Sequence, residues 1–110
     1  MRFPDPCEKQ DLKMIVNIHK REGKILVAVC DSSLLGKHFA EDNRQLDLSA
    51  GFYQGEEKIS AEAGDLLRNA DFVNIVGEEA VALGIKEGVV DASSVRRISG
   101  IPFVEGAVVH

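Results

Sequence analysis

The residues of this chain that could bind a ligand are spread over most of its length and form no recognised catalytic motif. Asp31 ends an apolar run that is typical of a buried strand, and ligand sites favour the ends of such strands in α/β sheets. Its carboxylate could equally cap the helical turn that follows. The candidate binding residues are Asp31, Lys37, Phe52, Tyr53, Asn74, Arg96 and Arg97.

Lys37 lies in a segment that superficially resembles a nucleotide phosphate loop. That loop requires a glycine five residues before the glycine of its Gly-Lys pair, and a Ser or Thr after the lysine. This chain has Asp31 and His38 at those two positions. The sequence therefore argues against a nucleotide loop and keeps Lys37 only as a candidate binding residue.

Phe52 and Tyr53 are adjacent in a glycine-flanked loop. Their rings could stack on a nucleic-acid base or on a partner side chain. Alternatively, one ring anchors the core and the other is partly exposed. Asn74 lies near the end of an apolar run, where its amide could face a ligand or bond a neighbouring backbone group. The sequence leaves these alternatives open.

Arg96 and Arg97 are neighbours, so on a strand their side chains point to opposite faces. Together with Lys20, Arg21 and Lys24 they could form a modest basic surface. The alternative is that these are ordinary solvated charges.

The histidines and cysteines do not suggest a metal site. His19, His38 and His110 show no ligand spacing with one another or with Cys7 and Cys30. No Ser-His-Asp or Cys-His arrangement can be recognised either. We therefore expect no cofactor, no metal and no catalytic residue, and both cysteines as reduced thiols of an intracellular protein.

Composition indicates an ordinary globular protein. Hydrophobic residues make up 45% and charged residues 28%, whereas aromatics are only 5%, so the core must consist mainly of aliphatic side chains. The net charge of −5 argues mildly against non-specific nucleic-acid binding. No signal-peptide pattern and no apolar run of about 20 residues is present, so we expect a cytoplasmic protein without membrane contact.

Period-two patterning predicts a hairpin of two strands at 12–19 and 25–30. The second strand is apolar on both faces and is therefore expected near the centre of the sheet. The next segments are expected to be a helical turn (31–36), a polar segment (38–44), a short strand (45–49) and a loop (51–57).

Apolar residues at helical spacing then predict a helix capped by Ser60. An apolar run after Asp71 predicts a strand that stops at Gly77, and the residues up to Lys86 predict a helix that ends at Gly88. Small residues recur along this second helix, so we expect it to pack tightly on the sheet.

The C-terminal part is expected to form strands at 95–98 and 103–109. Pro102 should interrupt the chain between them, because proline cannot donate to a strand ladder. Gly106 should mark a bulge or an edge.

This order of elements predicts an α+β fold. We expect a single two-layer domain over 11–110, with a mixed or antiparallel sheet of about five to six strands covered by two main helices. Residues 1–10 contain Pro4 and Pro6 and are expected to form an extended or disordered arm.

Short motifs, in order from about Val16 to Val109, resemble the archaeal domain-of-unknown-function 424 family. They are Val29-Cys30-Asp31, Leu34-Leu35-Gly36-Lys37 with Phe39, Phe52-Tyr53 with Gly55, Asn74-Ile75-Val76-Gly77-Glu78 with Ala80-Val81, and Ile98-Ser99-Gly100-Ile101-Pro102. The resemblance implies a small, intracellular, archaeal-type protein and no particular reaction. Phe103 stands where the resemblance leads us to expect His, so a metal or acid–base role is not expected there.

The leading functional hypothesis is a non-catalytic binding module that contacts RNA or a protein of the translation or RNA-processing machinery. A second hypothesis is a small-ligand protein or small enzyme whose polar site forms where Asp31, Lys37, Tyr53 and Asn74 converge. A third is a structural homo-oligomer that pairs sheet edges through the strand at 103–109.

Overall fold

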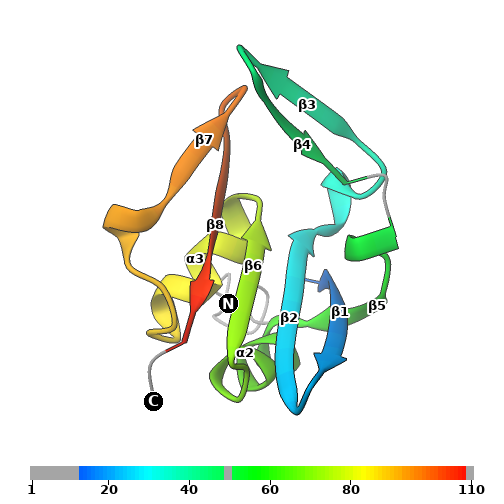
Figure 1. Cartoon of the computed structure of the whole chain (residues 1–110), viewed down its shortest axis with the longest axis vertical. Coiled ribbons are helices and arrows are strands. Elements are labelled where there is room, and N and C mark those ends of the chain that lie inside the picture. Colours follow the sequence, from blue (N-terminus) through cyan, green and yellow to red (C-terminus); the bar gives the residue numbers. More distant parts are fainter. Residues whose placement is uncertain (1–12, 49–50, 109–110) are drawn as a thin grey trace, which may run out of the picture.

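The computed structural model of the protein describes residues 13–48 and 51–108, except for the side chain of Phe52. These residues form a six-stranded sheet in the order β5-β1-β2-β6-β8-β7, a separate sheet of β3 and β4, and two α-helices (Figure 1). In the main sheet β2 and β6 are parallel, and all other neighbours are antiparallel. The predicted α+β fold is confirmed.

The bounds of the elements are as follows. The main sheet contains β1 (Lys13–Arg21), β2 (Lys24–Asp31), β5 (Glu56–Ile59), β6 (Phe72–Val76), β7 (Arg96–Ile98) and β8 (Ile101–Ala107). The second sheet contains β3 (His38–Glu41) and β4 (Arg44–Asp47). The helices are α2 (Ser60–Arg68) and α3 (Glu78–Lys86), with single 3₁₀ turns η1 (Ser32–Leu34), η2 (Gly51–Tyr53) and η3 (Ala92–Ser94).

The two faces of the main sheet are covered differently. Both helices pack on one face, which we call the helix face, and they lie behind the sheet in Figure 1. The opposite face, which we call the distal face, is partly covered by η2 and by the segments around β4. Because β2 lies between two cores, Val27 and Val29 pack toward the helices whereas Ala28 and Cys30 pack on the distal side. The predicted hairpin and the central place of its second strand are confirmed.

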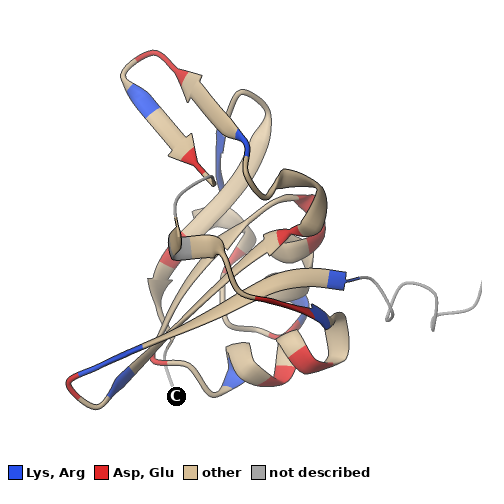
Figure 2. Cartoon of the chain, turned by 90° about the vertical axis from the view of Figure 1, so that its right-hand side faces the viewer, with Lys and Arg blue, Asp and Glu red and all other residues tan. Residues whose placement is uncertain are grey.

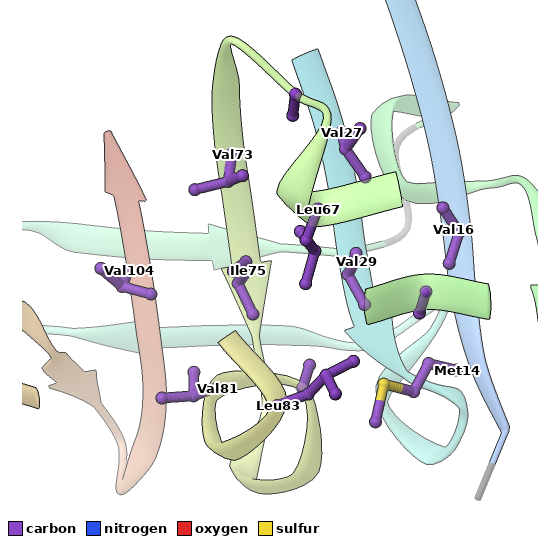
Figure 3. Packing of buried hydrophobic residues seen from close by; sticks show 13 residues of the cluster. Met14, Val16, Val27, Val29, Leu67, Val73, Ile75, Val81, Leu83 and Val104 are labelled. Carbon is purple, nitrogen blue, oxygen red and sulfur yellow. The ribbon is translucent and has the colours of Figure 1, made fainter. Parts of the chain in front are cut away.

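The helix-face core consists of aliphatic side chains, as the low aromatic content requires. Leu67 of α2 and Leu83 of α3 reach down between the strands, toward Val29 and Ile75 (Figure 3). A Cβ at Gly84 would lie 2.9 Å from the Ile75 Cδ1 atom, so the glycine lets α3 approach β6 closely. The expected tight packing of this helix is therefore confirmed.

Two short strands were not expected from the sequence. Residues 38–41 were assigned to a polar segment, but β3 pairs with β4 through a turn at Asp42, whose φ is +57°. Residues 56–59 were assigned partly to a loop, but β5 pairs with the edge of β1. Both strands lie at edges and expose most of their side chains, so they lack the apolar alternation that marks a buried strand.

The prediction that Ser60 caps α2 is wrong. The helix begins at Ser60 itself and Ile59, the last residue of β5, holds the cap position without a side-chain hydrogen bond. The reason is that β5 runs directly into the helix, which buries Ser60 and removes it from the cap. In contrast, the predicted end of α3 is confirmed, because Gly88 has a φ of +77°.

The predicted break between the two C-terminal strands is confirmed, since the chain turns at Ser99 and Gly100. The role given to Pro102 is wrong, because Pro102 is the second residue of β8. Proline has no N–H, but no sheet hydrogen bond is lost here. The Gly77 carbonyl, which faces Pro102, already accepts a hydrogen bond from the Val81 N–H of α3. Gly106 continues the register with β6, so the bulge is excluded. It lies beyond the end of β7, which fits the edge alternative.

Several sequence predictions fall on residues that are not described. The expected arm (1–10), with Cys7, and the last residues of the chain, with His110, lie outside the described ranges. No helix in the described part of the chain is long and apolar enough to cross a membrane.

Candidate functional site

Asp31 caps a helix, although not the turn next to it in sequence. Its Oδ1 accepts a hydrogen bond from the Ala80 N–H at 2.8 Å, and its Oδ2 accepts one from the Glu79 N–H at 3.2 Å. The carboxylate is 8% exposed, so burial raises the pKa of Asp31 above its ordinary value, although the two N–H groups act in the opposite direction. Asp31 therefore joins the end of β2 to the start of α3, and the expected cap of η1 is not formed.

Gly77 makes this contact possible. It holds the N-cap position of α3 with a φ of +111°, a region that residues with a Cβ rarely adopt. A Cβ there would lie 2.3 Å from the carboxyl carbon of Asp31. The strand–glycine–helix junction in the sequence is thus the place where a distant carboxylate satisfies the first backbone donors of the helix.

Tyr53 and Asn74 meet on the distal face. The Tyr53 hydroxyl donates to the Asn74 Oδ1 at 2.7 Å, and the Asn74 Nδ2 donates to the Glu105 Oε2 at 3.3 Å. Tyr53 is 7% exposed, and burial, with smaller contributions from Cys30 and Glu105, raises the pKa of its phenol. Tyr53 is therefore the core anchor of the aromatic pair, whereas the Phe52 side chain lies outside the described residues.

The four residues of the predicted polar pocket do not converge. Asp31 follows Val29 on the helix face, whereas Asn74 lies in register with Ala28 on the distal face. Lys37 is exposed on the connection to β3, where its carbonyl accepts from the Leu48 N–H. The structure brings Tyr53 and Asn74 together and adds Glu105, which no pattern in the sequence marks as a site residue.

The basic residues also separate into two groups. Arg97 points to the helix face, where its Nη1 binds the Glu78 Oε2 at 3.0 Å, and Arg96 lies on the distal side beside Phe103. Their opposite orientation agrees with the prediction. They belong to β7, which β6 and β8 separate from β2 in the main sheet, far from the β1–β2 turn (Figure 1) with its exposed residues Lys20, Arg21 and Lys24. One continuous basic surface is therefore not formed.

The Cys30 thiol is not placed to react. The thiol is a free cysteine that is fully buried, and burial followed by the charge of Asp31 raises its pKa to about 12. Within the described ranges, no group of three or more His, Cys, Asp or Glu side chains is placed to hold a metal ion.

An exposed aromatic residue that sequence analysis missed lies on the distal face. Phe72, the first residue of β6, is 41% exposed. It lies in one row with His19, Leu26 and Ala107, which belong to β1, β2 and β8. The signal in the sequence was its separation by two residues from Asn74, which places both side chains on the same face of the strand.

Basic side chains border this row at one end. The β1–β2 hairpin carries Lys20, Arg21 and Lys24 at its turn and bends to the side away from the helices (Figure 2). Arg21 and Lys24 are directly paired across the hairpin. This end of the distal face, which we call the lower distal face, thus combines an exposed ring at the start of the central strand β6 with the basic side chains of Arg21 and Lys24 at its border.

Comparison with known proteins identifies relatives without a known activity. The family described as "Protein of unknown function (DUF424)" matches residues 19–106. Among solved structures, the chain is similar to that of an uncharacterized conserved protein from Methanopyrus kandleri, with 25% sequence identity and a TM-score of 0.77. The similarity covers 87% of this chain and 91% of that chain. No curated protein matches the sequence.

Proposed function

The chain belongs to the DUF424 family of proteins of unknown function, and we propose that it is a non-catalytic binding module for single-stranded RNA. It acts as an accessory factor of translation or RNA processing, and the RNA lies on the lower distal face of the main sheet. The observation that carries this proposal is the exposure of Phe72 in the middle of that face.

A flat aromatic ring on a sheet is a suitable platform for an unpaired base. Stacking of a base on an aromatic side chain contributes about 1–3 kcal/mol and does not require a particular base. The polar side chains of Asn74 and Glu105 lie next to Phe72, in the adjacent row of the same face. These groups are able to bond the edge of a stacked base, in the manner of RNA-binding sheets.

The charge distribution supports a local rather than a general affinity for RNA. The chain as a whole carries a net charge of −5, which repels polyanions. The β1–β2 turn, however, places Arg21 and Lys24 on the distal face beside the row that contains Phe72, whereas Lys20 points to the helix face, like Ile18. A strand that stacks on Phe72 therefore has its phosphates within reach of this turn, and double-stranded RNA, whose bases are already stacked, is a poor ligand.

Binding of labelled oligouridine and oligoadenine of about ten nucleotides, followed by fluorescence anisotropy, tests the proposal. Phe72→Ala should weaken binding about tenfold, because it removes one stacking interaction, whereas Phe72→Tyr should preserve it. Ile18→Ala is the matched control, since Ile18 is 39% exposed on the helix face and should not affect affinity. Equal affinity of Phe72→Ala and the wild type would overturn the proposal.

A protein partner from the same machinery is the competing assignment. It is separated from RNA by recovery of the wild type and Phe72→Ala from native lysate, with and without nuclease. Partners that survive nuclease treatment and do not respond to Phe72→Ala would move the function to another surface of the protein.

A further inference from the structure

The outer edge of β8 is longer than the strand that covers it. β7 pairs only with residues 101–103, whereas β8 continues to Ala107. In Figure 1 the chain that precedes β7 bends away from β8, which continues downward beside β6. Among the described strands, none pairs with the outer side of β8 over 104–107.

The backbone groups on that side can be identified from the hydrogen bonds at both ends of β8. The Pro102 carbonyl accepts from the Gly77 N–H, and the Val108 N–H donates to the Asp71 carbonyl. Even-numbered residues of β8 therefore bond toward β6. Because an antiparallel strand alternates its bonding direction, the N–H and C=O groups of Glu105 and Ala107 point outward.

A groove lies along this edge. Between residues 88–91 and the lower part of β8 there is a cavity of about 300 Å³. A cavity of about 460 Å³ adjoins it toward β7, and both are lined by Ser94, Val104 and Glu105. We call this continuous groove the β8 slot. Val95, the residue between η3 and β7, packs against the helix-face core.

One basic side chain, that of Arg96, lies at the end of the slot nearest β7. Arg96 lines the larger cavity, and among the described residues it has no ion-pair partner, whereas the neighbouring Arg97 binds Glu78. Glu105 lines both cavities, and its carboxylate accepts a hydrogen bond from the Asn74 Nδ2. Farther from Arg96, the slot is bordered by the side chain of Asp91. The slot therefore contains one cation, Arg96, where β7 begins, and two carboxylates, Glu105 and Asp91, along its length.

We propose that the β8 slot binds the extended C-terminal segment of a partner protein, which adds a strand to the outer edge of β8. Two outward-facing residues of β8 provide backbone bonds, and about four residues of peptide fill the length from Val104 to Ala107. The peptide terminates where β7 begins, since β7 already occupies the rest of the edge.

The charges select the direction of the peptide. A strand antiparallel to β8 runs parallel to β7 and brings its C-terminal carboxylate to the guanidinium of Arg96. A parallel strand would bring an N-terminal ammonium to the same cation, which is unfavourable. Along the remaining slot, Asp91 and Glu105 favour neutral or basic side chains in the residues that precede the carboxylate.

The experiment is a selection from a library of random peptides displayed with free C-termini, against the wild type and Arg96→Gln. The selected peptides are then synthesised as free acids and as C-terminal amides. Binding is followed by chemical-shift changes of the protein amides. The free acids should shift Glu105, Ala107 and Ser94, and amidation should weaken binding at least about fivefold, because it removes a charge-assisted contact.

Two variants make the test specific. Arg96→Gln should abolish the difference between acid and amide, whereas Arg97→Gln, which changes the neighbouring arginine on the other face, should preserve it. Ala107→Pro should weaken both peptide forms, because it removes an outward donor that β6 does not use. Failure to select any peptide whose binding depends on Arg96 would overturn the proposal. Two other results would overturn it as well, a shift of the Ser94 amide caused by oligouridine and shifts of all three amides caused by self-association alone, because either result assigns the slot to another occupant.

Discussion

At the scale of single residues, Asp31 has the clearest structural consequence. Its carboxylate satisfies two backbone donors of α3 from the end of another element. Asp31→Ala removes both acceptors and should lower the free energy of unfolding by about 1–3 kcal/mol. Asp31→Asn keeps one acceptor oxygen and should cost less. Urea denaturation of both variants at neutral pH measures the difference, and equal losses would show that the charge, not the acceptor, matters.

The same residue predicts a pH dependence with a definite sign. Burial raises the pKa of Asp31 above its ordinary value of 3.8, so the folded protein holds this proton more tightly than the unfolded chain. The associated stability is fully present below the unfolded pKa and is lost as the pH rises through the folded pKa. The wild type should therefore lose stability relative to Asp31→Asn as the pH rises above the ordinary value of 3.8 and through the raised pKa of the folded protein. A difference that is constant, or that changes in the opposite direction, would contradict the assignment.

At the scale of elements, Gly55 should determine how closely β5 approaches β1. A Cβ at this position would lie 2.1 Å from the Val16 carbonyl oxygen, which is a backbone atom that cannot rotate away. Gly55→Ala should therefore displace β5 and cost about 1–3 kcal/mol. Gly51→Ala is the control, because a Cβ there meets no atom within 4 Å and should change stability little. Thermal unfolding of the two variants compares them, and equal midpoints would mean that β5 adjusts freely.

Elements were predictable from the sequence to the extent that they bury an apolar pattern. β2 and the β6–α3 unit follow from apolar runs and from a glycine at each end of the helix. The strand β5 was not predictable, because it exposes charged side chains at an edge, and its pairing with β1 is a tertiary effect. The site was harder to predict from the sequence than the elements. Asp31 binds residues that are far away in sequence. Asp31 and Asn74 do not meet, because their side chains lie on opposite faces of the sheet.

At the scale of the whole molecule, the sheet has two exposed surfaces to which we assign different partners as proposals. The lower distal face presents Phe72, and the β8 slot presents backbone groups with Arg96 at one end. They adjoin at β8, where Ala107 is in register with Phe72. A protein tail in the slot would therefore border an RNA strand on the face. Edge-to-edge dimerisation through β8 remains a prediction from the sequence, and it would occupy the same slot.

The overall acidic charge makes the salt dependence of RNA binding a sensitive test of where the RNA lies. The two basic side chains of the β1–β2 turn on the distal face, Arg21 and Lys24, neutralise at most about two phosphates, so the slope of log K against log salt for single strands should be about −1.4. Lys24→Gln should reduce the magnitude of the slope by about 0.7, whereas Lys86→Gln, at the end of α3 on the opposite side of the sheet, should leave it unchanged. A slope near zero would mean that phosphates are not contacted. A much steeper slope would require basic residues beyond this turn, and would place the RNA elsewhere on the protein.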